Sequence, residues 1–158
     1  MTQLLPRIAL AIAVALAITT VASAQSDLRI GTWTLNVAKS VYAPGPPPAS
    51  ETRTYAAHGN TLQVSIESVD PKGNHTSLRY AAGDDGKDYP MTGLSFANAV
   101  KMQRIDSQTF IVTTKKDGAA IGTTRGEISK DGKTLTLTTR MINSSGGTIK
   151  NIGVYDKR

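Results

Sequence analysis

Apolar and polar residues alternate one by one in several short segments of the chain. The clearest examples are residues 62–66, 100–103 and 134–138, where Leu, Val, Ile or Met positions are separated by polar ones. A period of two is typical of a β-strand that packs one face on a core and turns the other to water. Threonine supplies much of the polar side, which suits a β-branched residue. These segments therefore predict half-buried strands.

Turn-forming residues separate these segments at intervals of roughly ten to fifteen residues. They are Gly59-Asn60, Asp70-Pro71-Lys72-Gly73, Asp84-Asp85-Gly86, Asp117-Gly118, Asp131-Gly132 and residues 143–147. Glycine, aspartate and asparagine tolerate the positive φ of hairpin turns. Outside residues 1–24 no helical apolar period appears, and the intervals are too short for parallel crossovers. The sequence therefore predicts an all-β antiparallel meander, either closed as a barrel or folded as a sandwich.

Residues 44–48, Pro-Gly-Pro-Pro-Pro, interrupt this pattern. Such a stretch is stiff and extended, and it cannot pair as a central strand. It lies between the segment around Trp33 and the strand expected at residues 52–57. We expect it to form a loop across one mouth of a barrel. A plain linker is the alternative, but it would separate a single strand from the rest.

The first 24 residues have the organisation of a secretory signal peptide. Arg7 gives a positive start, an apolar run extends from Ile8 to Ile18, and Ala22-Ser23-Ala24 fits the cleavage pattern. The run is shorter than the ~20 residues that span a bilayer comfortably. We expect one mature domain, residues 25–158, exported to a bacterial periplasm or secreted, without stable membrane insertion. A retained anchor is the alternative.

Composition narrows the function classes. The chain has no cysteine, so an exported domain would depend on its core for stability. Its net charge is +6, but the basic residues are scattered, and the longest runs are pairs such as Lys115-Lys116. No basic stripe is interleaved with stacking aromatics, which argues against nucleic-acid binding.

Few residues suggest metal or catalytic chemistry. His58 and His75 adjoin turns far apart in the sequence, and two histidines alone make a poor metal set. Asp84, Asp85 and Asp88 do not have calcium-loop spacing, and turn chemistry accounts for them. The sequence has neither a Gly-x-Ser-x-Gly elbow nor a cysteine nucleophile. We therefore predict no metal, no cofactor and no enzyme activity. An enzyme with an unmarked acid–base pair is the alternative.

Three segments carry a resemblance to a known family. Gly31-Thr32-Trp33 resembles the Gly-x-Trp motif that opens lipocalins and related calycins. Residues 153–157 are similar to the last strand of intracellular fatty-acid-binding proteins, and residues 129–135 to their late hairpin. The mature chain as a whole resembles small exported bacterial lipocalin-like proteins. The resemblance implies one up-and-down barrel of about eight to ten strands. It also implies that Trp33 closes one end and that a small apolar or amphipathic molecule occupies the interior.

The resemblance also suggests polar ligand contacts. Fatty-acid-binding proteins hold a ligand carboxylate with an Arg-x-Tyr motif on the last strand and an arginine from an earlier strand. Tyr155 matches the tyrosine and Arg125 matches the earlier arginine, whereas Gly153 stands where the motif has arginine. The fatty-acid-binding helix pair is replaced here by the proline-rich segment.

Alternation adds a second arginine and raises a question about Tyr155. Arg104 continues the phase of Met102, so alternation predicts that it points inward. Tyr155 is out of phase with the apolar Ile152 and Val154, which would place Tyr155 outside. The resemblance and the alternation disagree on Tyr155, and both orientations remain open.

The leading hypothesis is an exported barrel that binds a small apolar or amphipathic ligand. Its apolar lining is expected from Leu62, Val64, Ile66, Val100, Met102, Phe110, Val112, Leu135 and Leu137. An eight-stranded barrel can also be filled by side chains alone. The alternative is therefore a filled barrel that docks another exported protein through its loops, in the manner of calycin-type protease inhibitors, with residues 44–48 as the contact.

Overall fold

Each alternating segment of the sequence forms a strand in the computed structural model, which describes residues 27–143 and 145–158. The strands are β1 (Gly31–Leu35), β2 (Val41–Ala43), β3 (Ser50–His58), β4 (Thr61–Val69), β5 (His75–Ala82), β6 (Asp85–Thr92), β7 (Ala99–Arg104), β8 (Thr109–Lys116), β9 (Ala119–Ile128), β10 (Thr134–Ile142) and β11 (Thr148–Lys157). A short 3-10 helix, η1 (Val37–Lys39), follows β1. The predicted signal peptide, residues 1–24, lies outside the described residues.

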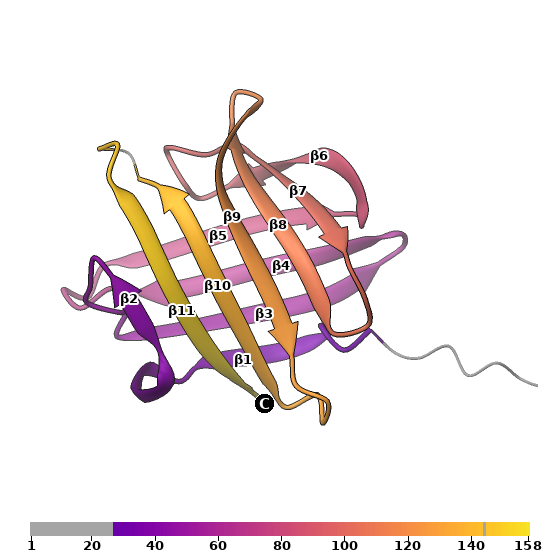
Figure 1. Ribbon diagram of the computed structural model, residues 1–158, viewed down its shortest axis with the longest axis horizontal. Helices are drawn as coiled ribbons and strands as arrows, with labels where there is room; N and C mark the ends of the chain where they lie inside the picture. The colour runs from indigo at the N-terminus through magenta and orange to yellow at the C-terminus, as the bar shows by residue number, and fades with distance from the viewer. Residues whose placement is uncertain (1–26, 144) are drawn as a thin grey trace, which may run out of the picture.

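The strands close into a barrel. From β3 to β11 each strand pairs antiparallel with the next one along the chain, and β1 pairs with both β3 and β11. In the closing pair, Trp33 lies opposite Lys157 and Leu35 lies opposite Tyr155. Figure 1 shows β8 to β11 crossing in front of β3, β4 and β5. The fold is thus a closed ten-stranded antiparallel meander barrel, which confirms the predicted fold class and excludes the sandwich.

One end of the barrel, here called the closed end, is filled by side chains. Trp33, Met102 and Leu135 are almost completely buried there. The Trp33 indole nitrogen donates a hydrogen bond of 2.8 Å to the carbonyl oxygen of Arg29, and the Lys157 ammonium lies 4.8 Å from the ring centroid. Trp33 therefore joins the segment before β1 to the last residues of β11.

The connection from β1 to β3 runs along the opposite end, here called the open end. After η1, strand β2 pairs with β11, so that Val41 lies opposite Ile152 (Figure 1). Residues 44–49, the proline loop, then share a groove with Ile149 of β11 and with Asp70 of the β4–β5 turn. The proline loop therefore passes from one wall to the other at this end, as a loop at a barrel mouth should.

None of the helices in the described residues is long and apolar enough to cross a membrane.

Candidate functional site

The barrel encloses a cavity of about 300 Å³ between its core and the open end. Its apolar wall is formed by Tyr55, Ile66, Leu78, Tyr80, Met91, Leu94, Val100, Phe110, Val112, Leu137, Met141 and Ile149. Inward-pointing residues toward the open end, such as Leu94 and Met141, are only half-buried, whereas the closed end is packed. The cavity therefore faces the end along which the proline loop runs.

Several residues predicted to line the interior do line the cavity, and others do not. Ile66, Phe110, Leu137 and Tyr155 are part of its wall. Leu62, Val64, Met102 and Leu135 are buried but lie outside the cavity wall. Alternation identified the inward face correctly for all of these residues except Tyr155, which it placed outside. It carries no information on where along a strand the side-chain packing ends.

The structure settles the orientation of Tyr155. Its side chain points inward and the residue is 1% exposed, whereas Ile152 is 44% exposed. The Tyr155 ring lies back over Gly153, where a Cβ atom would come within 2.8 Å of the ring atom Cε2. An arginine side chain at position 153 would need the space that this ring fills.

A polar cluster forms one side of the cavity, consisting of Tyr42, Glu51, Arg53 and Tyr155. Glu51 and Arg53 are two residues apart on β3, so both point inward. Arg53 Nε donates to Glu51 Oε1 at 2.7 Å, and the Tyr155 hydroxyl donates to the same oxygen at 2.7 Å. The Arg53 guanidinium also lies 5.0 Å from the centroid of the Tyr155 ring. The cluster therefore couples β3 to β11, the two strands that flank β1.

The environment of the polar cluster fixes its protonation. Burial lowers the pKa of Arg53, but the Glu51 carboxylate and the neighbouring tyrosines outweigh this, and the pKa lies well above its usual value. Burial raises the pKa of Tyr155 well above its usual value, although the Arg53 charge acts in the opposite direction. Burial likewise raises the pKa of Tyr42. At neutral pH the cluster thus presents a guanidinium cation and two protonated hydroxyls.

Hydroxyl groups continue the polar surface. Thr114, Thr124 and Thr139 line the cavity from β8, β9 and β10. The hydroxyls of Thr124 and Thr139 are 2.9 Å apart and hydrogen-bonded to each other. The cavity is therefore amphipathic, with an apolar wall and polar groups on β2, β3 and β8 to β11.

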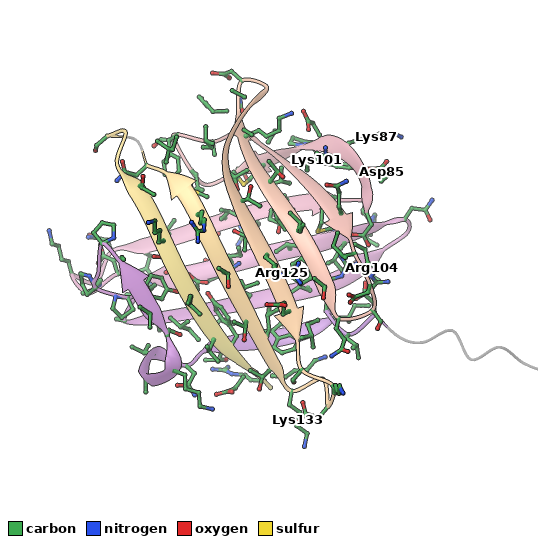
Figure 2. All side chains as sticks on the ribbon, viewed as in Figure 1. Asp85, Lys87, Lys101, Arg104, Arg125 and Lys133 are labelled. Carbon is green, nitrogen blue, oxygen red and sulfur yellow. The ribbon has the colours of Figure 1, made fainter. Side chains whose placement is uncertain are left out.

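The two arginines predicted as ligand contacts lie elsewhere. Arg125 is exposed on the outer face of β9, where it pairs with Glu127 at 3.1 Å (Figure 2). Its neighbours Thr124 and Gly126 occupy the inward positions, so β9 cannot turn Arg125 into the cavity. Arg104 is the last residue of β7, beyond the packed layer of Met102, and forms an ion pair of 2.6 Å with Asp27 (Figure 2). The arginine that lines the cavity is Arg53, and neither Arg104 nor Arg125 is part of the lining.

Arg53 and Glu51 were missed, although the sequence contains a signal for them. Glu51, Arg53 and Tyr55 recur at every second position and alternate with Thr52 and Thr54. An inward face with two charged residues does not look like a core face. Only the contact from Tyr155 on a distant strand shows that the charges are satisfied inside.

A second charged cluster belongs to the closed end. The buried Arg29 guanidinium contacts Asp84 at 2.6 Å and Asp27 at 2.6 Å, and lies 5.6 Å from the centroid of the Phe110 ring. This cluster ties the segment before β1 to the β5–β6 turn. It lies outside the cavity wall, so we assign it a structural role.

The two histidines do not meet. His58 ends β3 opposite Thr61, at one end of β4, and His75 begins β5 opposite Val69, at the other end. Within residues 27–143 and 145–158, no three His, Cys, Asp or Glu side chains form a group that could hold a metal ion.

Comparison with known proteins supports the fold. No family model matches the chain, and no curated protein matches its sequence. Among solved structures, the zebrafish ileal bile acid-binding protein, crystallised in complex with cholic acid, aligns with a TM-score of 0.50. The alignment covers 83% of this chain and 99% of that one at 13% sequence identity. This likeness shows a shared barrel fold.

Proposed function

We propose that the protein binds a small amphipathic molecule inside its barrel, with the apolar part on the cavity wall and the polar part at the polar cluster. The observation that carries the proposal is the 300 Å³ cavity with these two surfaces. A barrel filled by side chains would have refuted it. The zebrafish neighbour, which holds cholic acid, supports the same use of this fold.

The cavity volume limits the size of the ligand. At about 30 Å³ per water molecule in the liquid, the cavity corresponds to about ten waters. We therefore expect a ligand with at least about ten non-hydrogen atoms. The cholic acid of the zebrafish neighbour supports an amphipathic ligand for this cavity.

A series of 1-alkanols tests the proposal by calorimetry. Each buried CH₂ contributes about 0.8 kcal/mol, so affinity should rise about fourfold for each added carbon. The increase should stop at the chain length that fills the cavity, because atoms added beyond that length lie outside it. Undetectable binding throughout the series, or affinity that rises without a limit in length, would contradict the proposal.

A pair of neighbouring substitutions locates the binding. Thr139→Phe places a ring in the cavity, since Thr139 lines it, and should weaken alkanol binding at least tenfold. Thr138→Phe adds the same ring one residue earlier, on the outer face of β10, and should leave the affinity within twofold. Equal effects of the two substitutions would place the binding outside the barrel.

We also propose that the mature protein is exported, as its first 24 residues suggest. N-terminal sequencing of the protein isolated from its source should find Gln25 first.

Docking of another exported protein through the proline loop stays a prediction. Replacing residues 45–48 with a flexible Gly-Ser segment should abolish that docking while alkanol binding persists.

A further inference from the structure

The charges inside the cavity cancel. Among the described residues that line it, only Glu51 and Arg53 have charged side chains, and they form an ion pair at 2.7 Å. The guanidinium is therefore already paired with a carboxylate before any ligand enters. In this respect the cavity differs from a site that offers an unpaired cation to an acidic ligand.

A second carboxylate would be poorly accommodated. A ligand carboxylate at Arg53 would lose its hydration and would lie beside the Glu51 carboxylate. A ligand ammonium would face the reverse problem, because it would lie beside the Arg53 guanidinium. In a cavity with apolar walls, both like-charge contacts are weakly screened.

The ion pair nevertheless leaves hydrogen-bonding capacity on both partners. Arg53 uses Nε, and in the described residues neither Nη atom has an acceptor in hydrogen-bonding geometry. Glu51 Oε1 accepts from Arg53 and Tyr155, and Oε2 has no donor among those residues. Thr34 Oγ1 is the one fully buried side-chain polar atom without a partner in the part of the chain that the structure describes. The free Nη and Oε2 atoms are therefore accessible, on two residues that line the cavity.

We propose that the polar cluster selects an uncharged head group that both donates and accepts hydrogen bonds, a hydroxyl or a primary amide, and discriminates against carboxylates. A hydroxyl or a primary amide can accept from Arg53 and donate to Glu51 at the same time. A carboxylate can only accept. The high pKa of Arg53 keeps its guanidinium charged at neutral pH. This inference rests on the proposed function, because it concerns the ligand of the same cavity.

The test compares three eight-carbon ligands, 1-octanol, octanamide and octanoate, by calorimetry at pH 8. These ligands match the estimated ligand size and differ in the head group. Octanol and octanamide should each bind at least tenfold more tightly than octanoate. Octanoate binding equal to or tighter than octanol binding would overturn the inference while the proposed function stands. If none of the three binds, both fail.

A charge-removing substitution tests the physical cause. Glu51→Gln keeps an oxygen for Arg53 and Tyr155 but leaves the guanidinium without a counter-charge, so octanoate affinity should rise at least tenfold. Glu67→Gln is the matched control, because Glu67 forms an exposed ion pair with Arg79 at 2.7 Å. Glu67→Gln should change neither the octanoate affinity nor the octanol affinity. Unchanged octanoate affinity in a folded Glu51→Gln variant would also overturn the inference. If Glu51→Gln fails to fold, the relative affinities of the unaltered protein for octanol, octanamide and octanoate decide whether the inference stands.

Discussion

Replacing Arg29 with methionine would test how the closed end is held together. The substitution keeps an unbranched apolar side chain but removes the guanidinium. In the structure, the Arg29 side chain is 5% exposed. Its two Nη atoms donate to the two carboxylate oxygens of Asp84 at 2.8 and 2.6 Å, and Nε donates to Asp27 Oδ1 at 3.0 Å. The variant leaves both aspartates without this partner.

The expected cost follows from the burial of the partners. Removing one member of a buried ion pair typically costs about 3–5 kcal/mol. Here the side chains of Asp27 and Asp84 are 20% and 30% exposed, so water can hydrate them in part. Asp27 also keeps its ion pair with Arg104. We therefore expect Arg29→Met to lower the free energy of unfolding by about 2–3 kcal/mol, a fall in Tm of roughly 8–12 °C.

Trp33 provides the assay. It is the single tryptophan of the chain and is fully buried, so its fluorescence reports urea unfolding directly. Arg79→Met is the matched control, since Arg79 pairs with Glu67 on the surface and is 65% exposed. It should change the free energy of unfolding by less than about 0.5 kcal/mol. If Arg29→Met lowers the free energy of unfolding by less than about 0.5 kcal/mol, the structural role assigned to the Arg29 cluster is refuted.

Two further predictions concern packing and acid stability. A Cβ at Gly126 would collide with the Phe110 ring, which is 2% exposed, so Gly126→Ala should lower the free energy of unfolding by about 1–3 kcal/mol. A urea midpoint equal to that of the unaltered protein would contradict this packing. Burial raises the pKa of Asp27, but hydrogen bonds and charge from Arg29 outweigh it, and the folded-state pKa lies below the usual 3.8. Asp27 therefore stabilises the fold above that value and loses its contribution as the pH falls through the folded-state pKa. The stability difference between the unaltered protein and Asp27→Asn should shrink between about pH 5 and pH 2, and a constant difference would argue against the ion pair.

Alternation predicted the strands at residues 62–66, 100–103 and 134–138 because the inward positions of each segment are all apolar. Leu62, Val64 and Ile66 all point into the barrel, as their alternation requires. Tyr155 was ambiguous because β11 has apolar residues on both faces. Ile152 lies opposite Val41 of β2, so an apolar pair covers part of the outer surface there. Pairing with a short strand from a distant part of the chain cannot be read from alternation.

The polar part of the site was harder to predict than its apolar wall. Arg53 and Glu51 are stable inside because they satisfy each other and because Tyr155 reaches them from the other end of the chain. The residue types can be read from the sequence, but the contacts that these residues form inside the folded barrel cannot. Arg125 was chosen by its position before the late hairpin, and its inward neighbours Thr124 and Gly126 exclude it from the cavity.

The most direct test of ligand binding inside the barrel uses the methionine methyl groups. Met91 and Met141 line the cavity, whereas Met102 is fully buried outside its wall. In a ¹³C-methyl NMR titration with 1-octanol, the signals of Met91 and Met141 should shift together and saturate, and the Met102 signal should stay nearly fixed. If Met91 and Met141 do not shift at saturating octanol, the barrel interior is not the binding site.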